Sequence, residues 1–177
     1  MIWPRRTKNR SKGLGRALCD SAVRQAREPA LYAAMGVPDT IEGRFELLTT
    51  HVILLIDALR DLGPESAPSR QALFDAYLRD LDGALREMGV GDLTVGKRMR
   101  ALGRAFYGRA AAYRAAFTAL PNRTDLEGLI LRTVLAGVEG GSVAPLADYV
   151  LACRKSLAAE GRGLLEGADS GASWPAP

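Results

Sequence analysis

Histidine and cysteine are almost missing from this 177-residue chain, which has one histidine and two cysteines. Cys19 and Cys153 lie far apart and form no CxxC pair, so they cannot supply the set of bridges that holds small secreted proteins together. We expect both to be small apolar core residues in a reducing compartment. His51 has no second histidine to join it, so we predict a packed, hydrogen-bonded side chain at the flank of an apolar helix face. We predict no metal site and no cofactor.

Aromatic residues and long hydrophobic runs are also scarce. Aromatic side chains make up 6% of the chain, and alanine, leucine and arginine predominate over strand formers. This composition excludes most all-β folds. The longest aliphatic run is Val52–Ile56, far below the roughly 20 apolar residues of a membrane-spanning helix. We therefore expect no transmembrane segment, and residues 1–16 contain no apolar stretch of the kind that a secretory signal needs.

Acidic residues are absent from the first 16 positions, which carry six basic ones. The whole chain has 24 basic and 20 acidic residues, so the rest of it is slightly acidic and the formal charge of +4 belongs to this segment. Three interpretations stay open: a solvated arm that contacts RNA, a ribosome or anionic lipid; the start of an organellar transit peptide; or an inert tail. We assign residues 1–15 to a disordered basic arm and residues 161–177, rich in Gly, Ala and Ser, to a disordered tail.

The body between them, residues 16–160, reads as one compact all-α domain of about six helices without an internal repeat. Apolar residues recur at helical spacing throughout, and glycine or proline marks the breaks. Asp39 with Glu42, and Thr124 with Glu127, have the spacing of capping boxes. The expected helices cover residues 16–28 with a short piece at 30–35, then 39–62, 69–88, 94–120, 124–139 and 143–159.

Two patterns that suggest chemistry are weak. Residues 91–97 fit GxxxxGK, but Arg98 stands where magnesium binding needs Ser or Thr, and a helix rather than a strand precedes the segment. We interpret it as an interhelical connection in which Gly89 and Gly91 permit positive φ. A group of acids also clusters before it, interleaved with arginines, which indicates a solvated or salt-bridged face rather than an acid–base pair. These acids are Asp75, Asp80, Asp82, Glu87 and Asp92.

The segment from residue 93 to 124 has seven basic residues and no acid. On a helical wheel its apolar residues, Phe106 among them, fall in one arc and most of its bases in another, with Tyr107 on the basic side. Acids of the preceding helix could neutralise this face; otherwise it meets an anionic partner such as ribosomal RNA, lipid headgroups or an acidic protein. The candidate basic contact face consists of Lys97, Arg98, Arg100, Arg104, Arg109 and Arg114.

Three stretches together resemble the ubiquinol-cytochrome c chaperone family, the assembly factors of the bc1 complex. The first comprises residues 32–40 and 42–48 with His51. The second comprises residues 73–74, 80–82 and 85–92, and the third 95–99 and 105–109; the run MGVGD…VGKRM…AFYGR is the most specific part. The resemblance extends over about residues 20–155. Motif positions to which the family assigns no known role here are Asp39, Arg44, His51, Asp80, Asp82, Gly89, Gly91, Asp92 and Tyr107.

The resemblance implies an all-helical protein without enzymatic activity that holds nascent or newly inserted cytochrome b. It also implies possible contacts with the ribosome, an anionic membrane surface and a partner assembly factor, and no small-molecule substrate. Arginine supplies 20 of the 24 basic residues, and alanine and glycine are abundant, a composition typical of a GC-rich bacterium. We therefore expect a bacterial member in the cytoplasm, peripheral at the inner face of the plasma membrane. In a eukaryote we would expect the chain at the equivalent place, the matrix side of the mitochondrial inner membrane. The alternative is a basic helical ribosome- or nucleic-acid-binding module with no bc1 role.

Overall fold

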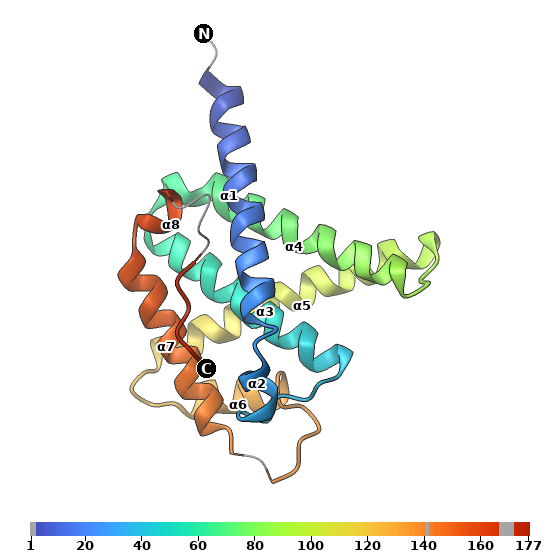
Figure 1. Cartoon of the computed structure of the whole chain (residues 1–177), viewed down its shortest axis with the longest axis vertical. Coiled ribbons are helices and arrows are strands. Elements are labelled where there is room, and N and C mark those ends of the chain that lie inside the picture. Colours follow the sequence, from blue (N-terminus) through green and yellow to red (C-terminus); the bar gives the residue numbers. More distant parts are fainter. Residues whose placement is uncertain (1–2, 141, 167–171) are drawn as a thin grey trace.

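A computed structural model describes residues 3–140, 142–166 and 172–177, and all regular structure in these ranges is helical (Figure 1). This confirms the predicted all-α class and single domain. No helix in the described ranges is both long and apolar enough to cross a bilayer. The elements are α1 (Trp3–Gln25), α2 (Pro29–Ala33), α3 (Ile41–Asp61), the 3₁₀ turn η1 (Pro64–Ser66), α4 (Ala67–Glu87), α5 (Asp92–Thr118), α6 (Thr124–Arg132), α7 (Ala144–Glu160) and α8 (Gly163–Glu166).

Helix α3 forms the centre of the molecule, and α1, α4, α5 and α7 pack around it (Figure 1). Its stretch from Leu47 to Leu55 is buried almost without interruption, including the aliphatic run Val52–Leu55. A helix that is apolar on all sides needs neighbours on all sides. Helices α1, α4, α5 and α7 each turn one face toward α3, whereas α6 packs against α5 and α7. The sequence pattern therefore accounts for a bundle around one core.

Helices α1 and α4 approach each other closely at Gly15. A Cβ atom added there would lie 2.5 Å from the carbonyl carbon of Ala72 and 2.6 Å from the backbone nitrogen of Leu73. Leu14 beside it is almost completely buried. The absence of a side chain at Gly15 therefore permits the two backbones to touch, and this contact fixes the N-terminal helix on the body.

The sequence predicts a disordered basic arm over residues 1–15, but the structure places most of this segment in helix α1. Helix α1 begins at Trp3, and its buried Leu14 and Gly15 already belong to the core. Lysine and arginine are good helix formers, so a segment rich in them can extend a helix whose end is anchored. The prediction of a disordered arm is thus wrong for residues 3–15, and residues 1–2 lie outside the described ranges.

The C-terminal tail also departs from the prediction of disorder. Residues 163–166 form α8, and residues 172–177 run as an extended segment between α7 and α1 (Figure 1). Trp174 and Ala172 pack against the core. Residues 167–171 lie outside the described ranges. Composition predicted a solvated tail because it gives no weight to a single tryptophan among small residues.

Helix α4 and the first half of α5 form a hairpin that extends away from the body (Figure 1). Its turn contains Gly89 at φ +79°, as predicted, whereas Gly91 has φ −64° and precedes α5 as its N-cap, so the prediction for Gly91 is wrong. Leu93 at the tip is fully exposed. Gly96 and Lys97 lie within α5, so the GxxxxGK pattern is part of a helix and not a phosphate loop.

Both predicted capping boxes have a different geometry. Thr40, not Asp39, is the N-cap of α3, and its hydroxyl accepts a hydrogen bond from the amide of Gly43 at 3.1 Å. Thr124 is the first residue of α6, and the carboxamide of Asn122 accepts from its amide at 3.0 Å. Helix α6 ends at Arg132, earlier than the predicted residue 139, whereas α7 matches its predicted bounds within one residue.

Candidate functional site

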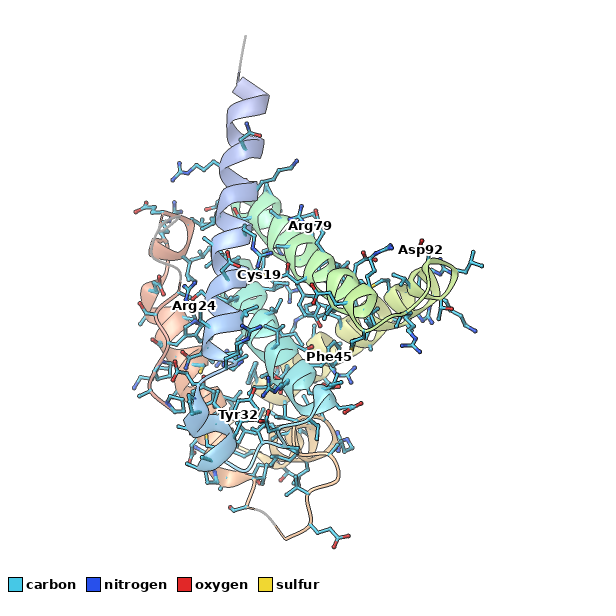
Figure 2. The ribbon with its side chains drawn as sticks, turned by 45° about the vertical axis from the view of Figure 1, so that its right-hand side comes forward. Cys19, Arg24, Tyr32, Phe45, Arg79 and Asp92 are labelled. Carbon is cyan, nitrogen blue, oxygen red and sulfur yellow. The ribbon has the colours of Figure 1, made fainter. Side chains whose placement is uncertain are left out.

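A groove of about 700 Å³ opens between the C-terminal part of α1, α2, the start of α3 and the end of α4, and Leu102 of α5 completes its lining. Figure 2 shows Tyr32, Phe45 and Arg79, which line it, on α2, α3 and α4. Two exposed apolar side chains, Ile41 and Met88, also belong to its lining, and Met88 keeps 51% of its surface exposed. The apolar lining residues are Val23, Ala26, Tyr32, Ile41, Phe45, Leu48, Leu81, Ala84, Leu85, Met88 and Leu102.

The charged rim of the groove combines both signs. Arg27, Arg44 and Arg79 contribute positive charge, and Glu42 and Glu87 negative charge. The guanidinium of Arg44 lies 5.9 Å from the ring centroid of Tyr32 and pairs with the exposed Asp39. Hydrogen bonding to Arg44 holds the pKa of Asp39 below its usual value. The predicted motif positions Asp39 and Arg44 thus come together at one edge of the groove.

Asp80, a third motif position, lines the groove and joins α4 to α1. Its carboxylate accepts two hydrogen bonds from Arg16, at 2.6 and 2.8 Å, and Arg16 also pairs with Asp20. This pairing lowers the pKa of Asp80. Cys19 beside it is buried, and burial raises the pKa of its thiol to about 12. The thiol is therefore neutral and unreactive at physiological pH, in agreement with the predicted core role.

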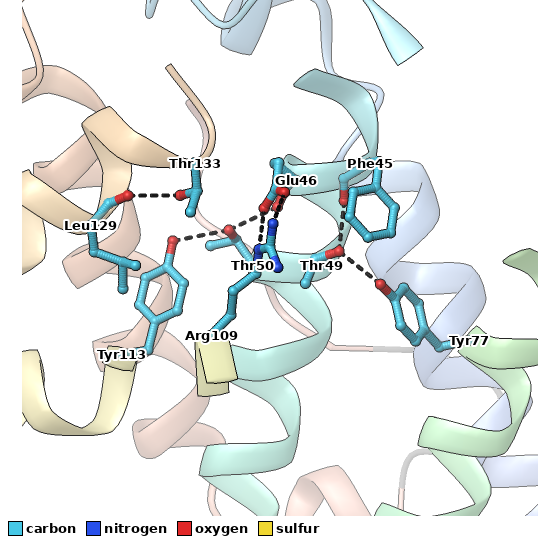
Figure 3. A network of polar contacts seen from close by, with 9 residues as sticks. All are labelled: Phe45, Glu46, Thr49, Thr50, Tyr77, Arg109, Tyr113, Leu129 and Thr133. Atoms are coloured by element: carbon cyan, nitrogen blue, oxygen red, sulfur yellow. Dashed lines mark hydrogen bonds and ion pairs between the residues drawn. The ribbon is translucent and has the colours of Figure 1, made fainter. Parts of the chain in front are cut away.

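A polar network on α3 holds α4 and α5 behind the groove (Figure 3). Thr49 donates to the carbonyl of Phe45, so the hydroxyl of Tyr77 on α4 donates to Thr49, 2.7 Å away. Thr50 is linked in the same way to Tyr113 on α5, at 3.0 Å. Burial raises the pKa of Tyr113 to about 12, so it remains a neutral donor.

Arg109 belongs to this network rather than to an open basic face. Its guanidinium makes two hydrogen bonds to the carboxylate of Glu46 on α3, and both side chains are largely buried (Figure 3). Arg114 lies 3.9 Å from Asp57 of α3. Two members of the candidate basic face therefore have acidic partners inside the chain, on α3 and not on the preceding helix.

The other four members, Lys97, Arg98, Arg100 and Arg104, are exposed on α5. No ion pair connects them to any part of the chain that the structure describes. Tyr107 lies on the same helix with 62% of its surface exposed and its ring 5.3 Å from that of Phe74. These four of the six predicted members leave the first half of α5 with exposed positive charge, and the contact of this surface with an anionic partner stays a prediction.

The acidic residues of α4 are mostly engaged in surface pairs. Arg86 pairs with both Asp82 and Asp92, and Gln71 donates to Asp75 at 2.7 Å. Figure 2 shows Asp92 at the far end of the hairpin formed by α4 and α5. Among the described residues, no three acidic, histidine or cysteine side chains gather as a metal ion would require.

His51 faces away from the groove, toward α7 and the C-terminal segment. It is completely buried; its Nδ1 lies 2.8 Å from the carbonyl oxygen of Leu47 and its Nε2 2.8 Å from the hydroxyl of Tyr149. Burial lowers its pKa to about 4, so the ring is neutral at physiological pH. This is the packed, hydrogen-bonded histidine that the sequence predicts.

The sequence pattern could not name the residues of the groove, because its walls come from five separate helices. Helical spacing assigns Leu81, Leu85 and Phe45 to apolar faces, but it cannot say which part of such a face another helix covers. The available signal in the sequence was an apolar residue near the end of an expected helix, Ile41 in one and Met88 in another. The contact of Trp174 with His51 was also missed, and the isolated tryptophan in a Gly/Ser-rich tail was its signal.

Comparisons with known proteins agree on one family. Residues 33–167 match the family model described as ubiquinol-cytochrome C chaperone. A crystal structure described as the Cbp3 homolog from Brucella abortus superposes with a TM-score of 0.82 at 32% sequence identity, covering 96% of this chain and 93% of that one. The comparison with curated proteins returned no match.

Proposed function

This chain belongs to the ubiquinol-cytochrome C chaperone family, and from that premise we propose that it acts without catalysis in assembly of the cytochrome bc1 complex. The proposed client is nascent or newly inserted cytochrome b. The proposed place of action is the cytoplasmic face of the bacterial plasma membrane, where the chain is peripheral, or the matrix face of the mitochondrial inner membrane in a eukaryote.

The apolar groove between α1, α3 and α4 is the observation that carries this proposal. Its wall contains residues from two of the three stretches that resemble the family, including Phe45, Leu81 and Leu85. A chaperone for a membrane protein must cover apolar segments of its client before they reach lipid. A groove with an apolar floor and a charged rim can do this, because burial gains free energy while the rim remains hydrated.

The shape of the site fits an amphipathic or apolar helix better than a small substrate. Apolar residues line both walls, from α3 and from α4, as in grooves that accept the apolar face of a helix. Ile41 and Met88 lie at the border and remain exposed in the free chain. A client helix seated in the groove would cover both.

The test replaces a border residue by aspartate in cells that depend on this chain. Met88→Asp introduces a charge into the groove, and we expect loss of bc1 haem b from the reduced-minus-oxidised spectrum of membranes and loss of cytochrome b from pull-downs. Leu131→Asp is the matched control, because Leu131 is similarly exposed on α6 and does not line the groove. Far-UV circular dichroism checks that both variants are folded.

The possible outcomes test the bc1 role and the groove as client site separately. If deletion of the chain leaves haem b unchanged, the bc1 role is wrong. If deletion lowers haem b while Met88→Asp behaves as Leu131→Asp does, the role stands and the groove is not the client site.

A second candidate function rests on the four unpaired bases of α5. A ribosome- or nucleic-acid-binding module would use Lys97, Arg98, Arg100 and Arg104 on phosphates. It predicts a steep loss of affinity with salt, because each neutralised phosphate releases a counterion. It also predicts that haem b does not depend on the chain, which the deletion experiment decides.

A further inference from the structure

The C-terminal segment 172–177 lies in a seam between α1 and α7, with α3 beneath it (Figure 1). It forms no helix or strand. Its backbone is instead bound by side chains from both helices. A backbone that is held by hydrogen bonds from neighbouring side chains is typical of a bound peptide rather than of an element of the core.

Two hydroxyls, a carboxamide and a carboxylate make these hydrogen bonds. On α1, Ser21 Oγ accepts from the amide of Ala172 at 3.2 Å, and Gln25 Nε2 donates to the carbonyl of Pro175 at 3.2 Å. On α7, Ser156 Oγ donates to the carbonyl of Ser173 at 2.9 Å. The carboxylate of Glu160 accepts from the amide of Ser173 at 2.9 Å.

Trp174 is the anchor of the segment. Its indole nitrogen donates to Ser21 Oγ at 3.0 Å, and its ring meets His51 edge-on with 5.0 Å between ring centroids. Ser21 and His51 are both buried, and Tyr149 of α7 bonds to both Gln25 and His51. The seam therefore offers a flat aromatic wall, a buried acceptor for an indole N–H and paired groups for an extended backbone.

We propose that this seam is a binding site for an extended peptide that carries a tryptophan, and that the chain's own residues 172–177 occupy it as a releasable ligand. A tryptophan that fills a pocket and satisfies its N–H is the usual anchor of a peptide interface. Pro175 and Pro177 restrict the free peptide and so reduce the entropy lost on binding.

The site and its resident peptide are separable. Every side chain of the segment remains at least partly exposed, whereas Leu146, Val150 and Cys153 of α7 belong to the buried core. His51 keeps its hydrogen bonds to Leu47 and Tyr149 without any contribution from the segment. Departure of the segment therefore opens the seam without removing a structural hydrogen bond from α3.

The experiment uses the 177-residue chain with Trp3→Phe and Trp174→Ala, which contains no tryptophan because the sequence has only two. The ligand is a synthetic peptide of residues 171–177, Gly-Ala-Ser-Trp-Pro-Ala-Pro, whose tryptophan is then the single fluorophore. We expect a saturable blue shift of its emission on binding. The same chain with Trp174 retained should bind a dye-labelled copy of the peptide at least about tenfold more weakly, because the tethered segment competes at high effective concentration.

Two controls define the site. Adding Ser21→Ala should weaken binding about 5- to 100-fold, because two hydrogen bonds to the peptide lose their acceptor. Ser69→Ala, which removes a buried serine hydroxyl from α4, should leave the affinity unchanged. A dye-labelled peptide with Trp→Ala should not bind.

A folded, tryptophan-free chain that binds the peptide no better than its Trp→Ala form would overturn the proposal. If that chain does not fold, the single variant Trp3→Phe replaces it, since Trp174 is then the single reporter. Its emission should be blue-shifted and should move to the red on Ser21→Ala. Solvent-like emission before the change, or a shift that depends on chain concentration, would disprove intramolecular occupation. None of these readouts depends on cytochrome b.

Discussion

Arg109 of α5 and Glu46 of α3 form a two-point ion pair in the largely buried space behind the groove. The pair joins α5 to α3. Beside it, the hydroxyl of Tyr77 bonds to Thr49 and that of Tyr113 bonds to Thr50. One guanidinium satisfies both carboxylate oxygens, a geometry that lysine cannot reproduce. The α5 side of the bundle is therefore fixed by specific polar contacts as well as by apolar packing.

Removal of Arg109 should destabilise the fold. Arg109→Ala leaves Glu46 without its partner in a site with little access to water, and we expect the free energy of unfolding to fall by about 2–4 kcal/mol. Arg104→Ala, on the exposed side of the same helix, should change it by less than about 0.5 kcal/mol. Urea denaturation followed by circular dichroism measures both. Equal losses in the two variants would show that the pair contributes nothing specific.

Two glycines of α1 should respond in opposite ways to alanine. Gly15→Ala places a methyl group against the backbone of Ala72 and Leu73, so α1 must shift and the free energy of unfolding should fall by at least about 1–3 kcal/mol. Gly13→Ala meets no atom within 4 Å and should stabilise the helix by up to about 1 kcal/mol. Thermal denaturation of both variants gives the comparison.

The Gly13 variant also tests the N-terminal helix itself. Were residues 1–15 an unfolded arm, Gly13→Ala would have no effect on stability, because alanine gains its advantage only where the backbone is helical. An unchanged stability in Gly13→Ala would instead support the disordered arm that the composition predicts.

Periodicity predicted most of the fold because most of the core is built from faces of single helices. The apolar face of α5 carries Phe106 and Tyr113, both buried as the wheel predicts. The position of α3 at the centre follows from its run Val52–Ile56, which no other segment equals. The physical reason is that a helical stripe is a property of consecutive residues and can be read without knowing the neighbours.

Contacts between side chains of different helices could not be predicted in this way. Arg98 and Arg109 have equivalent places at the edge of the apolar arc of α5, yet Arg98 is exposed and Arg109 pairs with Glu46. What distinguishes them is the position of an acid on another helix, which depends on packing. The groove is a stronger case, since five helices contribute to its lining and no pattern within any one of them shows that they face one another.

Stability should decrease as the pH falls from about 6.5 toward 4, because of His51. Its pKa is about 4 in the folded chain and about 6.5 when unfolded, so the unfolded state binds the extra proton over this range. The contribution of the neutral ring is complete above the unfolded pKa and is lost on acidification, about 2 kcal/mol of it between pH 7 and pH 5. Urea denaturation at a series of pH values measures this slope.

The same titration in His51→Gln isolates the histidine. The variant lacks the titrating ring, so its stability should change much less between pH 7 and pH 5, although it starts lower because the packing of Trp174 and the bond to Tyr149 are altered. Asp80, whose pKa lies below its ordinary value, contributes its own loss only at lower pH. Identical slopes in the two proteins would contradict the assignment.

The exposed bases of α5 should contribute to binding an anionic surface. Charge reversal at Lys97, Arg100 and Arg104 should reduce co-sedimentation with vesicles containing anionic lipid, or with ribosomes, while the free energy of unfolding stays nearly constant, because these side chains have no ion pair in the described chain to lose. The effect should be largest at low salt and shrink as the Debye length falls.

A second triple variant separates this face from the total charge. Reversal of Arg24, Arg132 and Lys155 also exchanges one lysine and two arginines for glutamates, but these exposed residues lie on α1, α6 and α7. If the exposed bases of α5 form the contact, the first variant should lose binding and the second should keep it. Equal losses would mean that net charge alone attracts the chain, whereas unchanged binding in both would remove α5 as a contact with the anionic surface.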